Sequence, residues 1–178
     1  MEKLIAFIKK VFSGKNEAGP AVVELLGGLP EEYTVFNGIL YNHSEIHHVV
    51  FSRAQGLFVI NPAHERGEIT YKGAHLLINR KPKSDIVKKT LKDTFWLKST
   101  IREQLGMDVY ITPLVAFENA KVKVTQPIIG VTVLESRGLV ETILNAPQRN
   151  ALEDGVVMVL RELQGIHTIN YRGNYRGA

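Results

Sequence analysis

The chain has 178 residues, is 44% hydrophobic and has a net charge of +4, a composition that fits one globular domain with a substantial core. It contains no cysteine, which excludes disulfides, thiolate metal sites and cysteine nucleophiles and fits a cytoplasmic protein. No apolar run approaches the roughly 20 residues of a membrane-spanning helix.

The chain begins with the pattern of a short amphipathic helix over residues 1–15. Its apolar side chains fall on one stripe, with the lysines outside it. We expect this stripe to pack on the domain or on a second copy of the chain, as in a homodimer; contact with a membrane surface is the less favoured alternative. Residues 16–166 form the predicted domain, and 167–178, with the repeated Asn-Tyr-Arg-Gly, form a flexible tail.

The first half of the domain contains one short predicted helix, Ala18–Leu29, and then several strands. Glu45–Ser52 alternates polar and apolar residues, and Leu57–Ile60 is a continuous apolar run typical of a strand buried on both faces. We expect these two strands to be neighbours near the centre of a sheet. The other strands predicted here are Tyr33–Tyr41, followed by a turn at Asn42-His43-Ser44, and the hairpin partners Glu68–Tyr71 and His75–Asn79.

A long helix is predicted from Ser84 or Asp85 to Leu105, ended by Gly106. Its expected core stripe comprises Ile86, Val87, Leu91, Phe95, Leu97, Ile101 and Leu105. The remaining predictions are the strands Val109–Phe117 (with Pro113 indicating an irregularity or an edge), Lys121–Val124 and Ile128–Leu134, and the helices Leu139–Leu144 and Pro147–Leu163. This order of elements predicts an α/β domain with a mixed central sheet flanked by helices.

One stretch, EIHHVVFSRAQGLFVINPAHERGEI over Glu45–Ile69, resembles the core motif of the nuclease-related domain (NERD) family, a branch of the PD-(D/E)XK nuclease superfamily. The matching positions are Glu45, Ile46, His48, Val49, Val50, Gly56, Phe58, Val59, Ile60, Gly67 and Ile69. Leu29-Pro30 matches the end of the family's first helix. The resemblance extends over roughly residues 18–144 and implies a restriction-endonuclease-like fold and a function in DNA handling.

The catalytic residues of that family are replaced in this sequence. The family's aspartate, glutamate and lysine are replaced by His47, Asn61 and Ala63. Its first acidic residue is replaced by Gly19, unless a small gap in the alignment brings Glu17 or Glu24 to that position. Where the family often has a glutamine, this chain has Lys88. Superfamily nucleases hold Mg²⁺ with carboxylates, which these positions lack. The resemblance therefore implies an inactive nuclease relative with no metal or cofactor. A Mg²⁺-dependent nuclease with a relocated site is the weaker alternative.

Histidines and acidic residues near the motif are candidate replacement ligands. His43, His47, His48 and His64 would suit zinc, but strand alternation places His47 and His48 on opposite faces, and we expect no metal. Glu65 and Glu68 could move into the site, but Gly67 indicates a turn that leaves Glu65 in solvent.

Basic residues are concentrated between Arg80 and Arg102, where eight lysines and arginines face only two aspartates. If the domain binds DNA, the predicted contacts are Arg80, Lys81, Lys83, Lys88, Lys89 and Lys92, with Trp96 stacking on a base. The alternative is that the lysines are simply solvated and Trp96 is buried by the N-terminal helix or by another subunit. Two functions follow from these alternatives, a DNA-binding inactive nuclease or a structural or dimerisation module, and neither uses a small-molecule substrate.

Overall fold

The computed structural model describes residues 21–149 and 151–173, with side chains described up to residue 165. The predicted helix over residues 1–15, Glu17 and Gly19 lie outside these ranges. None of the described helices is both long enough and apolar enough to cross a membrane. In chain order the elements are α2 (Val22–Leu26), β1 (Tyr33–Tyr41), β2 (Ser44–Ser52), β3 (Gly56–Lys72), β4 (His75–Ile78), β5 (Lys81–Pro82), α3 (Asp85–Leu105), β6 (Ile111–Val122), β7 (Thr132–Glu135), η1 (Ser136–Gly138), α4 (Leu139–Leu144) and α5 (Asp154–Gly173).

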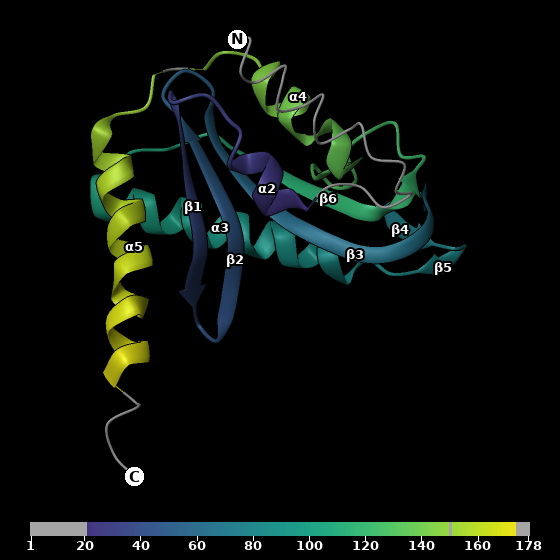
Figure 1. The fold of residues 1–178 in the computed structure, drawn as a ribbon, viewed down its shortest axis with the longest axis horizontal. Helices are drawn as coiled ribbons and strands as arrows, with labels where there is room; N and C mark the ends of the chain where they lie inside the picture. The colour runs from purple at the N-terminus through teal and green to yellow at the C-terminus, as the bar shows by residue number, and fades with distance from the viewer. Residues whose placement is uncertain (1–20, 150, 174–178) are drawn as a thin grey trace.

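The strands form one seven-stranded mixed sheet organised around β3 (Figure 1). On one edge, β3 pairs antiparallel first with β2 and then with β4, which in turn pairs with β5. On its other edge, β3 pairs in parallel with β6, and β6 pairs in parallel with β7. The predicted neighbours Glu45–Ser52 and Leu57–Ile60 are therefore confirmed, as is the α/β class with a mixed sheet.

The sheet forks along β3. The β2–β3 pairing ends at His48 opposite Ile60, and the β3–β4 pairing begins only at Ile69 opposite Ile78. Between these points no described strand pairs with this edge of β3, because β2 has turned away, and polar side chains of β2 and β3 can meet there. This fork positions the candidate site.

The hairpin predicted from Glu68–Tyr71 and His75–Asn79 is confirmed by the pairing of β3 with β4, but its first strand is not a separate element, because β3 runs without a break from Gly56 to Lys72. Gly67 is not a turn: its φ is 110°, and it pairs with Ala120 of β6 directly after a register shift between Ala63 and Arg66. Such an irregularity bends a strand without ending it. A glycine flanked by charged residues occurs both in turns and in strand bulges, so the sequence alone does not distinguish a turn from a bulge at Gly67.

Helices cover both faces of the sheet (Figure 1). On one face, α2 and α4 bury apolar side chains against Val50, Phe58 and Ile60. On the other, α3 contributes Leu97 and Ile101 to a core that also includes residues of β1, β2 and α5, and α5 lies beside β1. Burial of these fully enclosed side chains, at roughly 1.5–3 kcal/mol each, is the main term that stabilises the three-layer arrangement.

Two further predictions in the second half need correction. The strand predicted at Lys121–Val124 is in part the end of β6, and β6 is not an edge strand, since it lies between β3 and β7. Pro113 fits because β7 pairs with β6 only from Leu114 onward, which leaves that side of β6 open at the proline.

The helix predicted from Pro147 begins instead at Asp154. The preceding segment is held in an irregular path by the turn between β2 and β3: the amides of Arg149 and Leu152 donate to the carbonyls of Ala54 (2.7 Å) and Arg53 (2.9 Å). These bonds pair the amides of Arg149 and Leu152, which in a helix would pair with carbonyls of the preceding turn. The backbone of α5 then continues to Gly173, through part of the predicted tail; residues 174–178 lie outside the described ranges.

Candidate functional site

The buried face of α3 is more polar than predicted. Phe95 and Leu105, expected in the core, are 64% and 37% exposed, and Ile86 and Leu91 are only half-buried. The buried positions are Val87, Thr90, Asp93, Thr94, Leu97 and Ile101. The helix is rotated so that Thr90 and Asp93 point at the fork of the sheet. There they form hydrogen bonds with Tyr41 and Asn61.

Asp93 is the centre of this polar cluster and is fully buried. Its Oδ1 accepts the Tyr41 hydroxyl at 2.6 Å, and its Oδ2 accepts Asn61 Nδ2 at 2.8 Å and Lys89 Nζ at 2.7 Å. An isolated buried carboxylate would be very costly. Three donors, one of them charged, compensate that cost and hold the carboxylate in one orientation.

Lys89 supplies the positive charge of the cluster. Besides Asp93, its Nζ lies 2.6 Å from the Glu45 carbonyl oxygen and 3.3 Å from Asn61 Oδ1, so each of its three donors has an acceptor. The Lys89 side chain is 34% exposed and forms the outer wall of the cluster. The sequence placed Lys89 among the DNA contacts, but the structure turns its ammonium inward and uses all of its hydrogen bonds.

Asn61 links the helix to the two strands. Its Nδ2 also donates to Thr90 Oγ1 at 3.0 Å, and its Oδ1 lies 2.9 Å from His47 Nδ1. Because Oδ1 can only accept, His47 donates from Nδ1 in this arrangement. Two of the motif positions, His47 on β2 and Asn61 on β3, are thus brought together across the fork.

The other motif positions do not join the cluster. Ala63 is buried within an apolar cluster and offers no polar group. Glu24 is on α2, on the opposite face of the sheet from Asn61 and α3 (Figure 1). Lys88, at the family's glutamine position, is exposed on α3. Of the residues weighed as replacements, Glu65 pairs with Lys83 at 3.1 Å and is only partly exposed, and Glu68 pairs with Lys123.

The histidines near the motif are separated by the fold. His48 faces away from His47 and its Nδ1 lies 2.7 Å from Asn37 Oδ1, His64 pairs with Glu118 at 2.7 Å, and His43 is exposed in the turn between β1 and β2. In the described ranges, no group of three or more His, Asp or Glu side chains is arranged as a metal site.

Burial lowers the pKa of His48 from 6.5 to about 4, with the neighbouring His47 acting in the same direction. The unfolded chain therefore takes up a proton between pH 6.5 and 4 that the folded protein does not. The free energy of unfolding is unaffected by His48 above pH 6.5 and should decrease by roughly 2–3 kcal/mol as the pH falls to 4. Urea denaturation at several pH values should show this loss, and His48→Gln should remove it. His75→Gln, at an exposed histidine, is the matched control and should leave the pH dependence unchanged.

Trp96 supports the cluster from the side. Its ring stacks on Tyr41, with ring centroids 4.2 Å apart and planes 17° from parallel. Burial and the contact with Asp93 raise the pKa of Tyr41 to about 12, so its hydroxyl stays a donor at neutral pH. Of the two readings that the sequence left open for Trp96, a ring stacked on a base or a ring covered by protein, the contact with Tyr41 favours the second, although the covering residue is on β1 of the domain itself.

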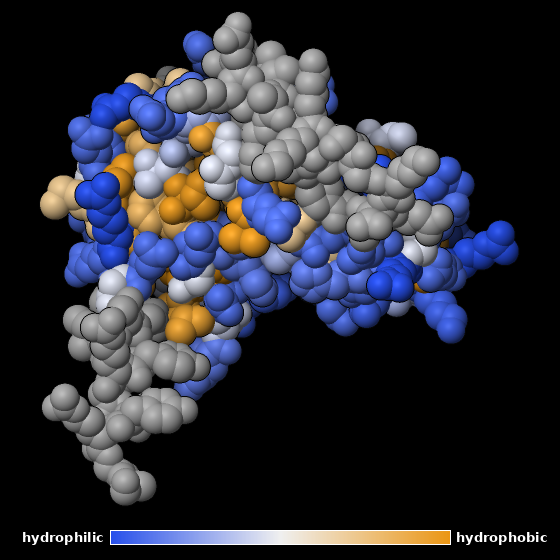
Figure 2. Space-filling view, in the orientation of Figure 1, coloured by the Kyte–Doolittle hydropathy of each residue, from blue (hydrophilic) through white to orange (hydrophobic). Residues whose placement is uncertain are grey.

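The remaining basic residues of the predicted interface are exposed. Arg80 and Lys81 lie at the tip of the β4–β5 hairpin, Lys83 follows it, and Lys88 and Lys92 are on the outer side of α3. Figure 2 shows hydrophilic side chains projecting from the end of the molecule where Figure 1 places β4 and β5. These side chains keep the access to solvent that a phosphate contact needs.

The hairpin tip is held in a fixed place by Asn79. Asn79 Oδ1 accepts the amide of Glu68 at 2.9 Å, and its Nδ2 donates to the carbonyl of Arg66 at 3.2 Å. Both partners flank Gly67, the glycine of the β3 irregularity. The basic tip is therefore a rigid extension of the sheet and does not depend on a mobile loop.

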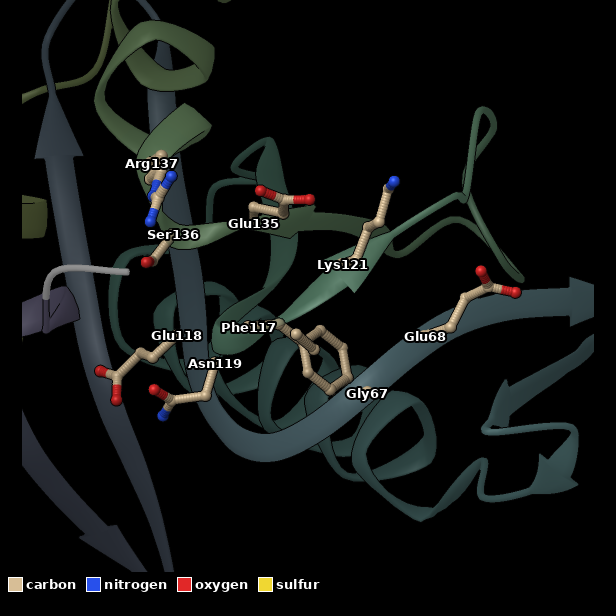
Figure 3. Close-up of a pocket in the computed structure, with 10 residues that line it drawn as sticks. Gly67, Glu68, Phe117, Glu118, Asn119, Lys121, Glu135, Ser136 and Arg137 are labelled. Carbon is tan, nitrogen blue, oxygen red and sulfur yellow. The ribbon is translucent and has the colours of Figure 1, made fainter. Parts of the chain in front are cut away.

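A pocket of about 540 Å³ lies beside the ends of β6 and β7 (Figure 3). Its wall includes Glu118, Glu135 and Ser136, whose buried Oγ has no hydrogen-bond partner. Glu118 is already occupied by the amide of Val22 and by His64, and Glu135 by the amide of Val122. These two acidic side chains therefore stabilise the fold through hydrogen bonds. The pocket is separate from the cluster around Asp93.

Comparisons with protein-family models, curated proteins and solved structures find no match to this chain. Sequence reasoning placed His47 and Asn61 at one site but missed Tyr41, Thr90 and Asp93. One signal was present: Lys89 and Asp93 are four residues apart in a helix, the spacing of an ion pair. Nothing in the pattern indicated that this pair is directed at the sheet.

Proposed function

We propose that the protein is a nuclease-related domain that has lost catalysis and binds nucleic acid through its basic surface. The proposed loss of catalysis is supported by the position of the Lys89 ammonium. It lies between Asp93, Asn61 and a strand carbonyl at the fork of the sheet. In the family that the sequence resembles, the motif residues on the equivalent strands hold a divalent cation.

An ammonium in that place changes the chemistry. It neutralises the buried carboxylate of Asp93 and fills the space around it with N–H donors, which repel a cation. Lysine can neither lower the pKa of a bound water nor polarise a phosphodiester as Mg²⁺ does. The network around Asp93 therefore has the properties of a structural element that replaces a metal site, and we expect no hydrolysis of DNA.

Two features support the link to a restriction-endonuclease-like fold. The first is the residue frame of Glu45–Ile69, which folds here as β2, a tight turn and the long β3. The second is the order that follows, with α3 leading into β6 and β7 in parallel with β3.

The second half of the proposal rests on charge. Arg80, Lys81, Lys88 and Lys92 are exposed and form no ion pair with any described residue. Exposed cations that form no ion pair with a described residue, carried on a hairpin and a long helix, suit the phosphate backbone of a nucleic acid. Lys83 contributes less, because Glu65 neutralises it.

Fluorescence anisotropy with labelled duplex DNA at increasing KCl tests this part. The wild-type protein should bind at low salt, with an affinity that falls steeply as salt rises. Replacing Lys81, Lys88 and Lys92 by alanine should reduce the slope of log affinity against log salt by up to about 0.9 per lost phosphate contact.

The control removes the same charge elsewhere: Arg53, Arg149 and Arg161, all exposed, are changed to glutamine. An equal loss of slope in both variants would indicate only a general effect of net charge. If the wild-type protein does not bind even at low salt, the domain is instead an interaction module with a filled cleft, and equilibrium sedimentation should then reveal self-association.

A further inference from the structure

The outer side of α3 presents one continuous exposed stripe. Its members are separated by three or four residues, the spacing of a single helix face: Lys88, Lys92, Phe95, Ser99 and Arg102. All five are exposed. At 1.5 Å per residue the stripe is roughly 21 Å long.

Phe95 is the feature of this stripe that needs an explanation. It is 64% exposed, whereas Trp96 beside it in sequence is half-buried against Tyr41. A single exposed apolar residue is common on protein surfaces. Here, however, the ring is flanked by Lys92 one turn before it and by Lys98 and Ser99 one turn after it, so it is an aromatic face within a row of cations.

The cations around Phe95 are free to bind a ligand. In the described ranges Lys88, Lys92 and Lys98 take part in no ion pair, and Arg102 makes only a long contact of 3.8 Å with Asp108. Lys89, on the inner side of the same helix, shows the contrast, since its ammonium is fully used by Asp93 and its neighbours.

We infer that this stripe binds single-stranded nucleic acid, with a base stacked on Phe95 and the backbone phosphates against Lys88, Lys92 and Lys98. The inference rests on the nucleic-acid binding proposed above and names the form of the ligand. A single strand exposes base faces that an aromatic side chain can cover, while a duplex stacks its bases on one another. An acidic protein could match the cations but would not require an aromatic ring between them.

The test compares a labelled oligothymidylate with a labelled duplex, by anisotropy at low salt. Phe95→Ala should weaken binding of the single strand about 5- to 150-fold, the equivalent of one lost base–aromatic stack, and should leave duplex affinity unchanged. Phe95→Trp, which keeps an aromatic ring, should bind the single strand about as tightly as the wild-type protein does. Met158→Ala, at another exposed apolar residue, is the matched control and should change neither affinity.

The outcomes separate this inference from the proposed function. If the wild-type protein binds neither ligand, both fail. If it binds both but Phe95→Ala has no effect on the single strand, the stacking inference alone is wrong. A dimer that dissociates on Phe95→Ala, with nucleic-acid affinity unchanged, would also overturn it, because Phe95 would then belong to a protein interface. Since Phe95 is outside the core, the melting temperature of each variant should stay close to that of the wild type.

Discussion

Lys89→Ala should lower the free energy of unfolding by about 3–5 kcal/mol, because it leaves the buried Asp93 carboxylate without its counter-charge. Tyr41 and Asn61 would still donate to Asp93, but neutral donors do not compensate a buried charge.

Urea denaturation followed by circular dichroism measures this effect, and Lys88→Ala provides the matched control. Lys88 is the adjacent lysine, is exposed, and should change the free energy of unfolding by no more than about 0.5 kcal/mol. A loss at Lys89 as small as that at Lys88 would show that the ion pair with Asp93 is not a structural element.

Gly67→Ala is the second substitution with a large expected effect, a loss of about 2–4 kcal/mol. Gly67 has a φ of 110°, where a side chain is strained, and an added Cβ would overlap the amide group of Asn79. Asn79 would then lose its bonds to Glu68 and Arg66, which hold the β4–β5 hairpin on β3.

Gly73→Ala separates the two causes. Gly73 also has a positive φ, 59°, but an added Cβ there meets nothing within 4 Å, so only the conformational strain of roughly 1 kcal/mol is expected. Thermal or urea denaturation of both variants checks the difference. Equal losses at the two glycines would show that the Asn79 contact contributes nothing.

The parts of the fold that the sequence predicts are those determined by local chemistry. The long helix begins after Ser84 and ends at Gly106, whose left-handed conformation (φ 67°) is one that glycine favours. The strands β1 and β2 follow from alternation and from the Asn42-His43 turn, which also has positive φ values.

The candidate site could be predicted only in part, because it depends on contacts between distant segments. His47 and Asn61 were located by the motif, but the hydrophobic stripe of α3 favoured Phe95 over Asp93 as a core residue. The rotation of the helix fits the polar groups of β1 and β3 that donate to Asp93, Tyr41 and Asn61, and these lie 52 and 32 residues away in sequence. A helical wheel does not include them.

The central claim, that the Lys89 ammonium occupies the place of a metal, is tested most directly by adding Mn²⁺ to ¹⁵N-labelled protein and recording amide spectra. We predict no selective paramagnetic broadening of the signals of His47, Asn61 and Asp93, and no cleavage when the same sample is incubated with labelled DNA and Mg²⁺. Selective broadening at those three residues together with cleavage of the DNA would contradict the account and would identify an active metal-dependent nuclease.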